Sequence, residues 1–85
     1  MMYPFMTLND ETEIVHSESK MIDGRETVKV VVEKPVWGGF HSAVCWLPDD
    51  RWEKIDGFSP EEIRHFQKII DDNIELILAK GKKQS

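Results

Sequence analysis

The chain has 85 residues, of which 40% are hydrophobic and 32% are charged, and its net charge is −5 at pH 7. This length and composition predict one small soluble domain spanning residues 1–85. The negative charge argues against nucleic-acid binding, which needs lysine and arginine to neutralise phosphates. No apolar run approaches the roughly 20 residues of a membrane-spanning helix, so we expect no membrane contact. Residues 1–6 do not resemble a signal peptide, and a single cysteine excludes an internal disulfide, which together favour a cytoplasmic protein.

The N-terminal part of the chain predicts a β-hairpin. Residues 5–8 and 12–17 have strand character, and the polar residues 9–11 between them favour a turn. The second strand has room to continue to Ile22. Asp23-Gly24 is the clearest turn signal in the chain, because this pair tolerates the positive φ angles of hairpin turns.

Residues 27–34 and 40–47 predict two further strands. Four valines make the first of them strongly β-favouring, and Val28, Val30 and Val32 share one face. The segment between the strands, residues 35–39, contains a proline and two glycines and predicts an irregular turn. Trp37 in this turn either folds back over the sheet or stands out as a binding anchor, and we favour the folded-back position because tryptophan usually enlarges the core of a small domain.

The segment after Pro48 predicts a short helical turn. Asp49 is suited to cap residues 50–54, and Trp52, Ile55 and Phe58 recur every third residue, which predicts that this connection packs inward.

Residues 59–80 predict one long helix. Ser59 and Glu62 have the spacing of a capping box, and Pro60 stands at the first helical position, where its missing N–H costs nothing. Gly81 is a natural residue to end the helix. The main apolar stripe faces the core, whereas Ile69 and Leu76 form a weaker second stripe. Either the sheet curls round to cover this second stripe or another subunit does. The predicted fold is therefore α+β: an antiparallel meander of about four strands with one long C-terminal helix across one face (ββββα).

The residues that often carry chemistry form no recognisable motif. Cys45 lies between Val44 and Trp46 and is typical of a buried, unreactive cysteine. His16, His41 and His65 lie on different predicted elements, and the carboxylates show no spacing that separates an acid from a base. We therefore expect no catalytic residue, no metal site and no cofactor.

These features favour a small interaction or regulatory protein that acts as a homodimer. Its acidic balance suits a basic partner protein. The candidate interaction residues are Trp37, Phe40, Ile69 and Leu76. The alternative is a small ligand-binding domain or enzyme with a cleft at the loop formed by residues 36–40, where Trp37 and Phe40 line the cleft and His41 supplies the polar group.

Overall fold

The structure, a computed structural model, describes residues 1–84. Within these residues the chain forms six strands followed by two helices. They are β1 (Met2–Thr7), β2 (Glu13–Ser17), β3 (Lys20–Ile22), β4 (Arg25–Val36), β5 (Gly39–Leu47), β6 (Arg51–Asp56), α1 (Pro60–Asp72) and α2 (Ile74–Lys83).

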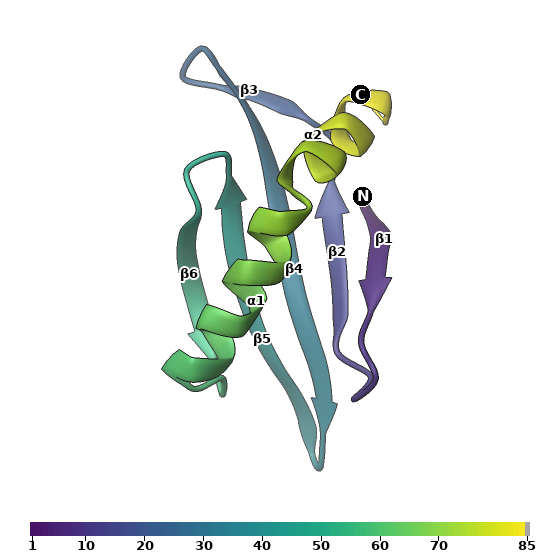
Figure 1. Ribbon diagram of the computed structural model, residues 1–85, viewed down its shortest axis with the longest axis vertical. Coiled ribbons are helices and arrows are strands. Elements are labelled where there is room, and N and C mark those ends of the chain that lie inside the picture. Colours follow the sequence, from purple (N-terminus) through teal and green to yellow (C-terminus); the bar gives the residue numbers. More distant parts are fainter. Residues whose placement is uncertain (85) are drawn as a thin grey trace.

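One antiparallel sheet forms the framework of the protein. Its strands follow the order β1-β2-β4-β5-β6, and the short strand β3 pairs with the first residues of β4. Both helices lie on the same face of this sheet, and α1 crosses it obliquely (Figure 1). The predicted α+β class with an antiparallel sheet is confirmed, but the sheet has six strands instead of four and the helix is divided into two.

The two predicted hairpin turns are present. β1 and β2 pair antiparallel around residues 8–12, and the turn between β3 and β4 has φ angles of 52° at Asp23 and 77° at Gly24. The strand character stops after Ser17, at the end of β2, and resumes at Lys20, at the start of β3. At the end of β2 the Ser17 hydroxyl accepts a hydrogen bond from the Lys29 backbone N–H at 3.0 Å. Ser19 N–H then donates to the carbonyl oxygen of Gly81 in α2 at 2.9 Å, which ties this crossing to the second helix.

The predicted helical turn at residues 50–54 is wrong, because this segment is strand β6. Trp52 pairs with Cys45 across the free edge of β5, and Val44 pairs with Glu53. Asp50 reverses the chain with a φ angle of 55°. Pairing with β5 satisfies the backbone groups on the side of β6 that faces the sheet, whereas an isolated helical turn would leave most of these groups without partners.

The core lies between the sheet and the helices. The valines predicted to share a face are completely buried there, beneath apolar residues of both helices. The buried hydrophobic residues of this layer are Ile14, Val28, Val30, Val32, Ala43, Cys45, Leu47, Phe58, Phe66, Ile70 and Ile77. Neither helix within residues 1–84 is long and apolar enough to cross a membrane.

The start of the helix is as predicted, and its end is not. Ser59 and Glu62 form both hydrogen bonds of the capping box, with Glu62 N–H donating to Ser59 Oγ at 3.1 Å and Ser59 N–H donating to Glu62 Oε1 at 2.9 Å. The helix breaks at Asn73, whose side-chain amide donates to the Ile69 carbonyl at 2.7 Å. Gly81 does not end the helix, because α2 continues to Lys83.

Candidate functional site

The sheet face turned away from the helices is the candidate site, and we call it the open face. Figure 1 shows that neither helix covers it. Because side chains alternate along a strand, every second residue of the paired strands points to this face. The register aligns these residues in three rows across the sheet. The acidic row is Thr7, Glu13, Glu33, Ser42 and Asp56; the apolar row is Pro4, Val15, Val31 and Val44 and ends at Glu53 on the edge strand β6; the basic row is Lys29, Trp46 and Arg51.

The acidic row places two carboxylates side by side. Glu13 and Glu33 are direct cross-strand partners, and neither forms an ion pair with another residue of the described chain. Like charges at opposed positions destabilise a sheet. A shallow groove of about 630 Å³ lies beside them and is also lined by Pro35 and Phe40. A cation placed on this row would relieve the repulsion.

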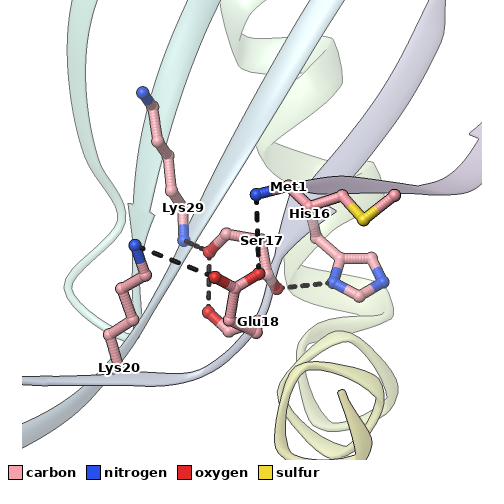
Figure 2. A network of polar contacts seen from close by, with 6 residues as sticks. All are labelled: Met1, His16, Ser17, Glu18, Lys20 and Lys29. Carbon is pink, nitrogen blue, oxygen red and sulfur yellow. Dashed lines mark hydrogen bonds and ion pairs between the residues drawn. The ribbon is translucent and has the colours of Figure 1, made fainter. Parts of the chain in front are cut away.

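The basic row is built around an aromatic ring. The ammonium of Lys29 lies 5.8 Å from the centre of the Trp46 ring, and the guanidinium carbon of Arg51 lies 5.9 Å from it. Both distances allow cation–π attraction. Arg51 also forms an ion pair with Glu53 at 3.0 Å, whereas Lys29 forms no ion pair with any carboxylate among residues 1–84. In Figure 2 the Lys29 side chain extends away from Glu18, which is paired with Lys20 instead.

The turn between β4 and β5 carries the most exposed aromatic residue. Trp37 is 103% exposed relative to a free side chain, so the expectation that it folds back over the sheet is wrong. Val36 pairs with Gly39, which leaves Trp37 and Gly38 as a two-residue turn, and Gly38 has a φ angle of 85°. So tight a turn extends beyond the neighbouring strands and offers the indole no surface to pack on. Phe40, on the open face beside it, is 63% exposed.

The two helix residues predicted as interaction candidates do not form a continuous stripe. Ile69 lies on α1, is half-buried and packs against the core. Leu76 lies on α2, beyond the break at Asn73, and is half exposed. Ile69 is therefore partly covered within its own chain, and Leu76 is the more exposed of the two.

The residues of the expected loop cleft do not meet. His41 lies on the helix-covered face, where its ring contacts Phe58 edge-on at 5.6 Å. Gly57 packs so closely on the same ring that a Cβ there would stand 2.2 Å from His41 Cδ2. Phe40 points to the opposite face and Trp37 points into solvent. The three side chains therefore do not line one cleft.

One other groove in the molecule is lined by polar groups with internal roles. A groove of about 520 Å³ beside the N-terminal end of α1 is lined by Asp10, Ser59, Glu62 and His65, among others. Three of its polar side chains are already engaged, since Ser59 and Glu62 bond to each other and Asp10 accepts from the Thr12 N–H at 3.1 Å. Within the described part of the chain, no three histidine, cysteine or carboxylate side chains gather as a metal site would require.

Cys45 is buried, as expected, and its chemistry follows from its position. It is completely covered in the core, and this burial raises the pKa of the thiol to about 12, with smaller contributions from the nearby carboxylates of Asp50 and Asp71. Since the thiolate is the reactive form, this cysteine is not a nucleophile at neutral pH.

Comparison with known proteins adds no assignment to this geometry. The chain matches no known protein-family model, and searches of curated proteins and of solved structures also give no match.

Proposed function

We propose that this protein is a small interaction or regulatory protein that binds a basic and partly apolar protein surface. The binding surface is the open face together with the turn between β4 and β5. The observation that carries this proposal is the complete exposure of Trp37 beside Phe40 and the unpaired carboxylates of Glu13 and Glu33. The proposed compartment is the cytoplasm, which suits a chain whose one cysteine is a free thiol.

The physical chemistry of this region fits protein recognition. Tryptophan is among the residues that contribute most to binding energy when a partner buries them, and exposed aromatic groups gain from removal from water. The adjacent carboxylates repel one another, so a lysine or arginine of the partner gains from both of them. A partner that presents cations next to apolar side chains satisfies both parts of the surface.

The test uses a defined probe, a peptide of alternating lysine and leucine, titrated into the isotope-labelled protein. The three indole N–H signals of Trp37, Trp46 and Trp52 report on separate places in the molecule. We expect the signal of Trp37 and the backbone signals of Glu13 and Glu33 to shift, and the signal of Trp52 under the helices to stay unchanged. High salt weakens the binding, because exposed charges are screened.

Two variants distinguish specific binding at this surface from non-specific binding of the peptide elsewhere on the protein. The double substitution Trp37→Ser and Phe40→Ser is expected to weaken peptide binding by about tenfold or more, since each aromatic group contributes on the order of 1 kcal/mol. The matched control is Leu76→Ser, because Leu76 is also an exposed apolar residue but lies on α2, on the other side of the sheet. Equal binding by the double variant and the native protein would refute the proposal.

A further inference from the structure

We infer that a second copy of this chain binds to the open face, so that two sheets stack with their helices outward. This inference rests on the proposed function, because it names the partner of the same surface. A basic and apolar surface of the required kind is present on the chain itself, in the row formed by Lys29, Trp46 and Arg51.

The two charges that β4 presents on the open face are placed symmetrically about Val31. Glu33 follows Val31 by two residues on β4, and Lys29 precedes it by two, so all three point to the same face. Each charge lies about 7 Å along the strand from Val31, and the two are therefore about 13 Å apart. They are too far apart to pair within one chain, but each stands at the right position to pair with the other in a second chain.

A twofold axis that runs across the strands through Val31 makes these pairs. It lies in the plane between the sheets and reverses the strand direction of the second copy. Glu33 of one copy then lies over Lys29 of the other, and on β6 Asp56 lies over Arg51. Glu53 lies on the axis at the edge of the sheet and faces its own copy, and its charge is compensated by the ion pair with Arg51 at 3.0 Å. Because the interface is symmetric, each pair occurs twice.

The opposite orientation is excluded by the same charges. A twofold axis parallel to the strands would lay Lys29 on Lys29 and Glu33 on Glu33, with no compensating contact. Charge patterns of this kind select one orientation of a complex more strongly than they add to its affinity. The stacked sheets of proteins are usually turned by about 30°, which at about 7 Å from the axis displaces a side chain by only about 4 Å.

The size and centre of the face are also those of a contact surface. Five strands about 4.8 Å apart, with β5 of nine residues, give a flat area of roughly 600 Å². Specific interfaces bury about 800 Å² per partner, so the open face alone provides most of the area needed. Val15, Val31 and Val44 lie at its centre, and charged residues lie around them, with Glu53 at the β6 end of their row, which is the usual arrangement of apolar core and polar rim.

The ends of the face are related in the same way. Trp37 follows Val31 by six residues, and Arg25 precedes it by six and pairs with the exposed Ile22. The twofold axis thus brings the exposed indole of one copy toward Ile22 and the ion pair between Arg25 and Asp49 of the other.

The test measures the molecular mass of the full chain by sedimentation from about 5 μM to about 500 μM, a range that detects dimers of ordinary affinity. The native protein is expected to dimerise, and the variants Glu33→Lys and Lys29→Glu are each expected to weaken the dimer by about tenfold or more, because each converts two attractive contacts into repulsive ones. Mixing the two variants restores a dimer, since every reversed group then faces an opposite charge on the other chain. The double variant Glu33→Lys/Lys29→Glu also dimerises for the same reason.

The controls separate misfolding and other interfaces from this one. Recovery in the mixture shows that both single variants are folded. A native protein that stays monomeric throughout would overturn the inference, and so would a dimer that Leu76→Asp dissociates but Glu33→Lys does not. In either case the proposed function survives if the lysine–leucine peptide still shifts the signal of Trp37. The peptide is also titrated into the monomeric Lys29→Glu variant, whose open face is not covered by a second copy, and no shift of the Trp37 signal there would overturn the proposed function alone.

Discussion

Gly81 of α2 lies so close to Val28 of β4 that a Cβ built at residue 81 would stand 2.8 Å from Val28 Cγ2. Val28 is completely buried and β-branched, so its methyl group has no room to move aside. On the other side of this contact the Ser19 N–H donates to the Gly81 carbonyl at 2.9 Å. Glycine at this position therefore lets the last turn of α2 approach the sheet and the crossing between β2 and β3.

The first prediction is that Gly81→Ala destabilises the protein. Inserting a methyl group into a packed contact typically costs 1–3 kcal/mol, and the better helix propensity of alanine offsets up to about 1 kcal/mol of it. We expect a net loss of about 1 kcal/mol in the free energy of unfolding, measured by urea denaturation. Gly39→Ala is the control, because a Cβ at Gly39 meets no atom within 4 Å.

The contact between Gly81 and Val28 also predicts that substitutions at the two positions have non-additive effects on stability. Val28→Ala alone leaves a cavity and is expected to cost about 2 kcal/mol or more. The double variant Gly81→Ala/Val28→Ala places the new methyl group where the valine methyl groups were. Its destabilisation should therefore be smaller than the sum of the two single effects, and simple additivity would show that the two residues are not in contact.

The second prediction concerns Asp50, whose carboxyl is partly buried in the turn before β6. Burial raises the pKa of Asp50, and the neighbouring carboxylate of Asp71 raises it further, while Gln67 acts in the opposite direction. A carboxyl whose pKa is raised by folding holds its proton more tightly in the folded state, so stability is lost as the pH rises through that pKa. Asp50→Asn removes this loss, and asparagine also tolerates the φ angle of 55° found there.

Thermal unfolding at two pH values tests this prediction. Asp50→Asn is expected to raise the melting temperature by a few degrees at pH 7 and to leave it nearly unchanged near pH 3, where the native carboxyl is protonated. The matched control is Asp72→Asn, since Asp72 is an exposed carboxylate at the end of α1. A lower melting temperature for Asp50→Asn at pH 7 would contradict the assigned cause.

The features that the sequence predicts correctly depend on neighbours along the chain. The capping box needs only Ser59 and Glu62, and the buried face of β4 needs only the alternation of its valines. Strand β6 depends on the free edge of β5, which no local pattern in residues 50–54 reveals. The exposure of Trp37 depends on the length of the hairpin relative to its neighbouring strands, which composition does not report.

The candidate site was predictable only in its parts. Trp37 and Phe40 stand out as aromatic residues around a glycine turn, and the alternation within β4 already places Lys29, Val31 and Glu33 on one face. The rows themselves require the register between strands, which sets Glu13 beside Glu33 and Trp46 beside Lys29. Register is a tertiary property, so the acidic and basic ends of the open face appear only in the structure.

The third prediction is that Cys45 resists alkylation in the folded protein. Burial raises the pKa of its thiol to about 12, so the reactive thiolate is scarce at pH 8 and the sulfur is covered. We expect iodoacetamide to modify the protein only in denaturant, with a rate in native buffer at least about a hundredfold lower. Mass spectrometry measures the modified fraction, and fast labelling without denaturant would show that the core opens at Cys45.

The fourth prediction tests the cap of α1. Ser59→Ala removes the side-chain acceptor for the Glu62 N–H and is expected to cost about 1 kcal/mol of stability. Ser42→Ala is the control, because Ser42 lies in the middle of β5 and is not part of a helix cap. Urea denaturation measures both variants, and equal stabilities would show that the cap contributes nothing.

The fifth prediction concerns the pH dependence of the same cap through Glu62. The hydrogen bond from the Ser59 backbone N–H is the main cause that lowers the pKa of the Glu62 carboxyl. A carboxyl whose pKa is lowered by folding contributes stability above its unfolded pKa, and that contribution is lost as the pH falls through the folded pKa. Glu62→Gln is therefore expected to be less stable than the native protein at pH 7, and this difference should disappear near pH 3, as thermal unfolding can show.

The control is Glu61→Gln. Glu61 shares the first turn and the helix dipole with Glu62 but is not part of the capping box, so this variant should show a smaller loss of stability at pH 7. Equal effects of the two substitutions would assign the pH dependence to the helix dipole instead of the hydrogen bond from Ser59.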